Sequence, residues 1–98
     1  MPLVKTYSDD GAQCSVTFVF NNAPNARSVT LVAEFNSWER ESLSMHRVDE
    51  HWELTVDLDA GEAYQYRYLV NGTDWFNDDD PDDYMAHPYG GENSVVQT

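Results

Sequence analysis

The chain has 98 residues, of which 41% are hydrophobic and 13% aromatic, and this suits one small domain spanning residues 1–98. Its 18 acidic residues against 5 Lys and Arg give a formal net charge of −13. That field repels phosphate backbones and anionic lipid surfaces, so we expect neither nucleic acid nor a membrane as a partner. The acidity indicates either a solvated surface or a high-salt habitat, where screening suppresses self-repulsion.

The sequence also bounds the cellular compartment. Cys14 is the single cysteine, so an internal disulfide is excluded and nothing points to an oxidising compartment. The first ten residues lack the basic region and apolar run of a signal peptide. No apolar run is long enough to cross a bilayer. We therefore expect a cytoplasmic protein.

The first half of the chain contains two clear strand patterns. Residues 3–7 predict a short entry strand, and residues 8–11 have the composition of a turn. Residues 14–20 and 29–35 then alternate apolar with mostly polar side chains, which is typical of half-buried strands. The second of these strands is expected to end at Asn36-Ser37-Trp38. Residues 43–45 are either a connection or a further short strand.

The second half contains the two most regular patterns. Residues 52–58 place Trp52 and three aliphatic side chains on one face, with polar side chains opposite. Residues 64–70 place three tyrosines and Val70 on one face, and Arg67 on the other. Asn71-Gly72 then supplies the positive φ angles of a tight hairpin turn. Residues 77–83 predict a polar loop, and residues 93–98 a last strand.

These short strands, separated by turns and without any helical pattern, predict an all-β fold. We expect an antiparallel β-sandwich of about seven strands. Its expected core is made of the apolar residues that recur at period two within the four clear strands. They are Val16, Phe18, Leu31, Phe35, Trp52, Leu54, Val56, Tyr66 and Tyr68.

Residues that could carry catalysis or bind a metal give little signal. A glycosidase needs two carboxylates across a cleft, but with 18 acids a pair such as Asp79 and Asp82 arises by chance. The acidic run at 78–83 lacks the glycine of an EF-hand turn. The three histidines, at 46, 51 and 87, lack metal-ligand spacing. We therefore expect no enzyme activity, no metal and no cofactor.

Four motifs in order give the chain a family resemblance. They are EFNSW at 34–38, YQYRYLVNG at 64–72 followed by Trp75, Asp80-Pro81, and NSVV at 93–96. Together they resemble carbohydrate-binding module family 48, the early-set domains of isoamylases, pullulanases and branching enzymes, and are similar to the glycogen-binding domain of the AMP-activated kinase β subunit. The resemblance covers residues 28–98. It implies an immunoglobulin-like early-set sandwich that binds α-1,4-glucans and has no catalytic residues.

The resemblance also implies which residues contact sugar. Trp38 and Trp75 match the tryptophans that stack on glucose rings in the glycogen-binding branch. Arg67 and Asn93 match residues that bond sugar hydroxyls. Tyr89 matches a large apolar residue that clasps the sugar.

The chemistry of these side chains agrees with that implication. Glucopyranose has C–H groups on its faces and hydroxyls around its rim, so it binds a flat aromatic plate with polar groups beside it. Other interpretations stand beside this one. Trp38 and Trp75 are alternatively core or edge residues, Arg67 a partner in a surface ion pair, and Asn93 a turn residue.

The sequence therefore favours a non-catalytic module that binds glycogen, starch or maltooligosaccharides. The partners expected with it are an α-glucan and either a glycan-processing enzyme or a kinase-like protein. The alternative is a structural or protein-interaction early-set domain that binds no sugar.

Overall fold

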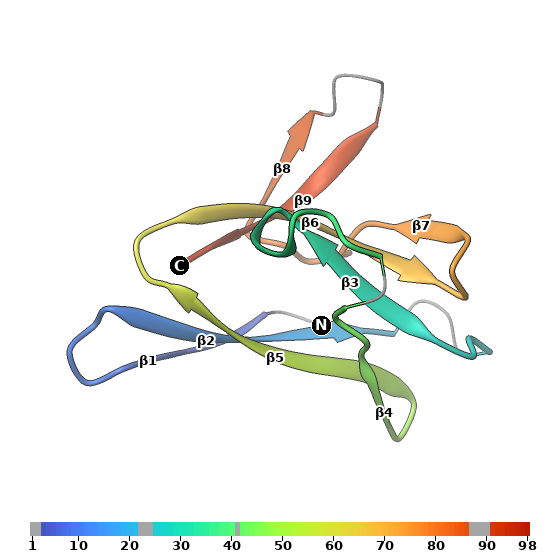
Figure 1. Ribbon diagram of the computed structural model, residues 1–98, viewed down its shortest axis with the longest axis horizontal. Coiled ribbons are helices and arrows are strands. Elements are labelled where there is room, and N and C mark those ends of the chain that lie inside the picture. The colour runs from blue at the N-terminus through green and yellow to red at the C-terminus, as the bar shows by residue number, and fades with distance from the viewer. Residues whose placement is uncertain (1–2, 22–24, 41, 87–90) are drawn as a thin grey trace.

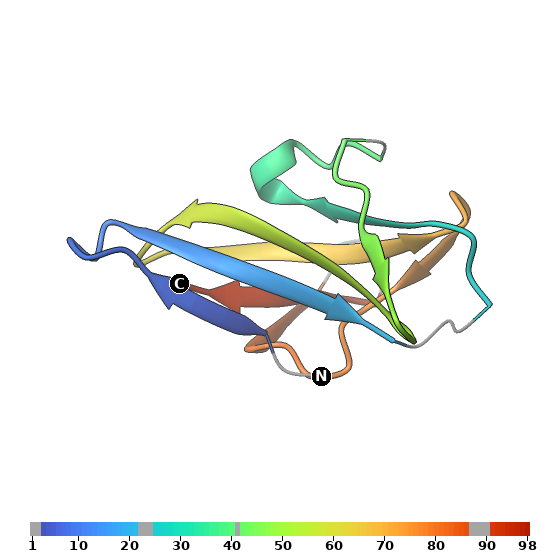
Figure 2. The ribbon, with the colours of Figure 1, turned by 90° about the horizontal axis from the view of Figure 1, so that it is seen from below.

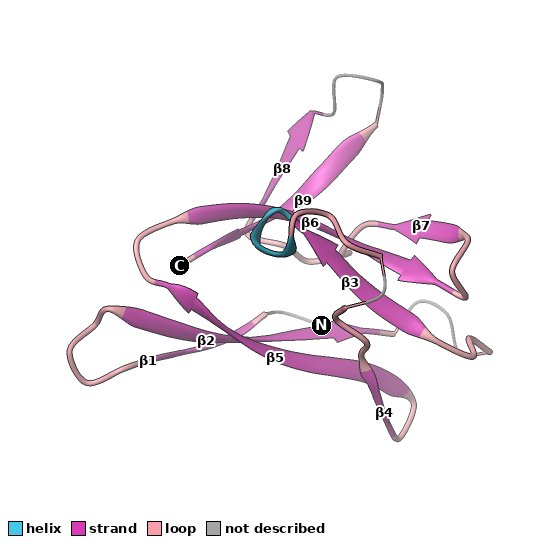
Figure 3. Cartoon of the chain, in the orientation of Figure 1, coloured by secondary structure: helices cyan, strands magenta, loops and turns pink. Residues whose placement is uncertain are grey.

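The computed structural model describes residues 3–21, 25–40, 42–86 and 91–98. They form two antiparallel sheets that pack face to face as a β-sandwich (Figures 1 and 3). The one helical element among the described residues is a 3₁₀ turn, η1, at Glu34–Asn36. No helix in the described part of the chain is long and apolar enough to cross a membrane. The predicted all-β sandwich is confirmed.

The first sheet has the strand order β1-β2-β5-β4. Its strands are β1 (Val4–Tyr7), β2 (Gln13–Phe20), β5 (His51–Asp59) and β4 (His46–Val48). Strands β2 and β5 pair along their length, from Gln13 opposite Asp59 to Phe20 opposite Trp52. This pairing brings the apolar residues of both strands onto one face, because residues directly opposite one another share a face.

The second sheet has the order β3-β6-β9-β8, with β7 also paired to β6. Its strands are β3 (Val29–Ala33), β6 (Ala63–Val70), β9 (Glu92–Gln97), β8 (Asp83–Ala86) and β7 (Asp74–Phe76). Figure 2 shows the two sheets overlapping, with η1 and the loop after it at the β3 edge of the sandwich. Strand β6 is the centre of the sheet, since three other strands pair with it.

Aromatic contacts between β2 and β6 join the two sheets. The ring of Phe18 meets that of Tyr66 edge-on with centroids 5.0 Å apart, and Phe20 lies 4.8 Å from Tyr68. All four side chains are buried. The alternation along β6 therefore fixes the inner face of this strand, and it turns Gln65 and Arg67 to the outer face.

The structure corrects three details of the sequence-based expectation. The described residues contain nine strands, where about seven were expected. The sequence pattern does not predict β4, β7 and β8, because β4 and β7 have three residues each and β8 is short and exposed. Strand β3 ends at Ala33, so Phe35 lies in η1 and is only partly buried. Leu54 and Val56 also pack against the core while remaining partly exposed.

The acidic loop is a fourth correction. Asp78 was expected in a solvated run, yet it is only 2% exposed. Its carboxyl oxygen accepts hydrogen bonds from the hydroxyls of Tyr66 at 2.6 Å and Tyr68 at 3.3 Å, and its backbone N–H donates to Ser94. Asp78 therefore joins the loop between β7 and β8 to the core, beside the hydrogen bonds that Asn77 and Asp82 make with β9.

Candidate carbohydrate site

The candidate site lies where β6 changes its neighbours. The first half of β6 pairs with β9 as far as Tyr66 opposite Ser94, and its last residues pair with β7 from Tyr68 opposite Phe76. On the other edge of β6, strand β3 ends opposite Tyr66. Arg67 sits between the two partners and points to the outer face, so the sheet leaves an opening around this side chain.

The turn after β3 presents Trp38 at this opening. Asn36 holds the turn together, because its Oδ1 accepts from the Ala33 N–H at 3.0 Å and its Nδ2 donates to the Glu39 carbonyl and to Ser42. Ser37 and Trp38 follow with φ angles of 58° and 59°, and the Trp38 N–H closes the turn onto the Ala33 carbonyl at 2.8 Å. Positive φ is rare for a residue as large as Trp. The indole is 39% exposed.

The hairpin between β6 and β7 presents Trp75. Asn71 and Gly72 have the positive φ values of 53° and 75° that the Asn-Gly pair predicts. Trp75 then lies directly opposite Leu69, on the same outer face as Arg67. Its side chain is 37% exposed, while Leu69 beside it is buried.

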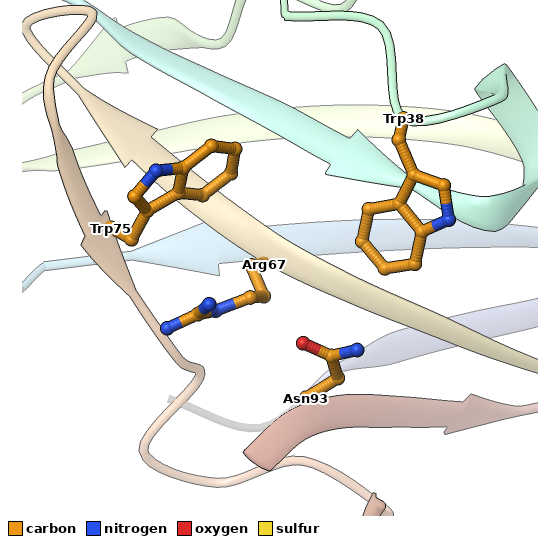
Figure 4. Close-up of a pocket in the computed structure, with 4 residues that line it drawn as sticks. All are labelled: Trp38, Arg67, Trp75 and Asn93. Carbon is orange, nitrogen blue, oxygen red and sulfur yellow. The ribbon is translucent and has the colours of Figure 1, made fainter. Parts of the chain in front are cut away.

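These elements surround a pocket of about 240 Å³. Trp38, Arg67, Trp75 and Asn93 are the described residues that line it. Figure 4 shows the two indoles on opposite sides, with Arg67 and Asn93 lying between them. The sequence-predicted residues thus come together from four separate elements: the loop after η1, β6, β7 and β9. Tyr89 lies outside the described residues.

Both polar residues of the pocket carry a buried atom without a hydrogen-bond partner. Among the described residues, neither the Nε of Arg67 nor the Oδ1 of Asn93 has one. Asn93 is only 4% exposed, so its side chain is not a solvated turn residue. Such unpaired buried atoms are costly, and a ligand that fills the pocket can relieve that cost. Arg67 offers a donor and Asn93 an acceptor.

Cationic side chains flank the Trp75 ring. The guanidinium carbon of Arg67 lies 5.6 Å from its centroid, and that of Arg40 lies 5.4 Å away. In the described part of the chain Arg67 forms no ion pair with a carboxylate, which was the alternative to a pocket role. Sequence reasoning missed Arg40, since an exposed arginine in a polar loop has no distinguishing pattern. It also missed Gln65, although this residue lies two positions from Arg67 in the same strand and therefore faces the same side.

The lining defines the chemistry open to the pocket. No carboxylate is among the described lining residues, and the described chain holds no cluster of His, Cys, Asp or Glu suited to a metal. Two aromatic plates with one donor and one acceptor between them can hold a flat ring with hydroxyls on its rim. The described lining of the pocket therefore suits the binding of such a ring.

Sequence comparisons point to a family. Residues 4–90 match the family described as carbohydrate-binding module 48 (isoamylase N-terminal domain). The 1,4-alpha-glucan branching enzyme GlgB of Pseudoalteromonas atlantica is 34% identical over 77 residues, 76% of this chain. The same enzyme of Prochlorococcus marinus is 33% identical over 90 residues, 90% of this chain. The chain spans 11% of the length of each enzyme.

Solved structures show the same fold at low sequence identity. The enterobactin esterase FES of Shigella flexneri, in the presence of enterobactin, superposes with a TM-score of 0.80 at 13% identity. The match covers 99% of this chain and 33% of the esterase. At this identity the likeness concerns the fold alone.

Proposed function

Because the chain belongs to the carbohydrate-binding module 48 family, we propose that it is a non-catalytic module that binds α-1,4-glucans in the pocket of Trp38, Arg67, Trp75 and Asn93. The observation that carries the proposal is the pairing of two exposed indoles with a buried donor and a buried acceptor that lack partners among the described residues. Relatives named as 1,4-alpha-glucan branching enzymes support the choice of glucan. The module then serves a glycan-processing enzyme.

The shape of the pocket favours an α-linked chain. The two indoles stand on opposite sides of the opening, with Arg67 and Asn93 between them (Figure 4). An α-1,4-glucan is curved and can place successive glucose rings against two such plates. A β-1,4-glucan is straight and requires plates that lie in one plane.

The expected affinity is modest. Stacking that removes about 80–100 Å² of apolar area contributes roughly 2 kcal/mol for each indole. Association and ordering of the oligosaccharide oppose this gain. We expect a Kd on the order of 10 μM to 1 mM for maltoheptaose.

Isothermal titration calorimetry tests the proposal. Maltoheptaose should bind and cellohexaose should not, and Trp38→Ala or Trp75→Ala should weaken binding by about tenfold or more. Changes at Arg67 should also weaken binding. Arg47→Ala is their matched control, because Arg47 stacks on the core residue Trp52 of the other sheet. Absence of maltoheptaose binding at millimolar ligand overturns the glucan proposal and leaves an interaction domain.

A further inference from the structure

Gln65 lies beside the pocket and is held at both its backbone and its side chain. It shares the outer face of β6 with Arg67, two residues away. Its backbone N–H lies just past the end of β3, where it donates to the Glu34 carboxylate at 2.6 Å instead of to a strand carbonyl. Its side-chain oxygen accepts a hydrogen bond from the Nδ2 of Asn93 at 3.0 Å.

This contact decides which end of the Asn93 amide faces the ligand. An amide carries a donor nitrogen and an acceptor oxygen, and rotation by half a turn exchanges them. With the nitrogen engaged by Gln65, the oxygen is the end left buried and without a partner among the described residues. Figure 4 shows this oxygen on the Arg67 side and the nitrogen on the opposite side. With Gln65 in its observed orientation, the reversed Asn93 amide would set its oxygen against the oxygen of Gln65.

We propose that Gln65 is a positioning residue of this site, which holds the Asn93 oxygen toward the ligand as a fixed acceptor. The inference rests on the proposed function and adds the chemistry that the site selects. Arg67 can only donate, so the pocket pairs one donor with one acceptor. Two neighbouring hydroxyls of a pyranose match this pair, one donating to Asn93 Oδ1 and the other accepting from Arg67. Glu34 supports the arrangement by fixing the backbone of Gln65.

Substitutions at Gln65 separate positioning from mere packing. Gln65→Met keeps the length of the side chain but removes the acceptor, so maltoheptaose affinity should fall about tenfold. Gln65→Glu keeps an acceptor for the Asn93 nitrogen and should restore affinity to within about threefold of the parent. Gln13→Met is the matched control, because it removes a side-chain hydrogen bond away from the pocket, the one that Gln13 donates to Asp59 in the first sheet. It should leave affinity unchanged.

A substitution at Asn93 tests the assigned acceptor. Asn93→Asp keeps an oxygen toward the pocket, and the Gln65 amide can turn to donate to the other carboxylate oxygen. We therefore expect Asn93→Asp to bind within about threefold of the parent and Asn93→Leu to lose about tenfold. If Asn93→Asp loses as much as Asn93→Leu, the ligand needs the nitrogen and the inference is overturned.

A measurement without ligand keeps this test apart from the proposed function. In nuclear magnetic resonance spectra, the side-chain NH₂ protons of Asn93 should exchange slowly in the parent and in Gln65→Glu, and quickly in Gln65→Met. Equal exchange in all three contradicts the inference, even if maltoheptaose binds. If exchange behaves as expected but the parent binds no maltoheptaose, the proposed function fails while the orienting role of Gln65 is established. Unchanged maltoheptaose affinity in Gln65→Met overturns the role of Gln65 and leaves the proposed function standing.

Discussion

At the scale of single residues, Arg67 combines two properties that lysine cannot reproduce together. Its guanidinium stacks on Trp75, and its Nε is buried without a hydrogen-bond partner among the described residues. A lysine ammonium is a compact charge without a planar fork. We expect Arg67→Lys to weaken maltoheptaose binding by about three- to tenfold and Arg67→Ala by at least as much, measured by calorimetry. Equal affinity of Arg67→Lys and the parent would show that charge alone suffices.

Tyr66 gives stability a dependence on alkaline pH. Burial, and then the neighbouring Tyr68 and Asp78, raise the pKa of Tyr66 far above its usual range. In the unfolded chain this hydroxyl has a pKa of about 10. The folded state therefore keeps its proton while the unfolded state releases it, so the stabilising contribution is full below pH about 10 and is lost as pH rises above it.

The size of this effect can be measured by urea unfolding at about pH 9 and about pH 11. For each buried tyrosine that stays protonated in the folded state, as Tyr66 does, the free energy of unfolding should fall by about 1.4 kcal/mol per pH unit above 10. Tyr66→Phe should show a shallower fall between the two pH values, although it is less stable at both. The same fall in Tyr66→Phe and the parent would show that this hydroxyl is not responsible.

At the scale of elements, the loop between β7 and β8 depends on Asp78. This residue joins the loop to β6 through Tyr66 and Tyr68, and to β9 through Ser94. Asp78→Ala leaves buried hydroxyls without a partner and should cost about 1–3 kcal/mol in chemical denaturation. Asp80→Ala is the control, since the exposed Asp80 should change stability by less than about 0.5 kcal/mol. Equal losses for both would remove the special role of Asp78.

The strands show how much of the fold the sequence could predict. Strands β2, β5 and β6 were predicted nearly to their ends, because each has one buried face and a strict alternation. The end of β3 could not be predicted, since the turn depends on Asn36 bonding back to Ala33, and Phe35 fits either geometry. The burial of Asp78 was equally hidden, because its partners lie on other strands.

The pocket was predictable for a different reason. The family resemblance implies Trp38, Arg67, Trp75 and Asn93, and each of them also stands at a local feature of the sequence: a turn motif, a strand parity, a hairpin and a last strand. Their meeting point depends on the register of β6 with three neighbours, which no single stretch encodes. The contacts of Arg40 with Trp75 and of Gln65 with Asn93 are consequences of that register, and they became visible only in the structure.

At the scale of the whole molecule, the charge of −13 opposes folding. Like charges crowd together in the compact state, and added salt screens them because the Debye length falls to about 10 Å at 0.1 M. We expect the melting temperature to rise as NaCl increases from low ionic strength to about 0.2 M. Thermal scans monitored by circular dichroism measure this. A flat or falling melting temperature across that range would contradict the charge argument.

The central claim is that an α-glucan binds between Trp38 and Trp75, and the three tryptophans of the chain test it in one titration. Each indole N–H gives its own signal in a nuclear magnetic resonance spectrum, and Trp52, buried in β5, serves as the internal control. As maltoheptaose is added, the signals of Trp38 and Trp75 should move together along one saturating curve while that of Trp52 stays in place. Signals of Trp38 and Trp75 that do not move, or that move no more than that of Trp52, would contradict the account.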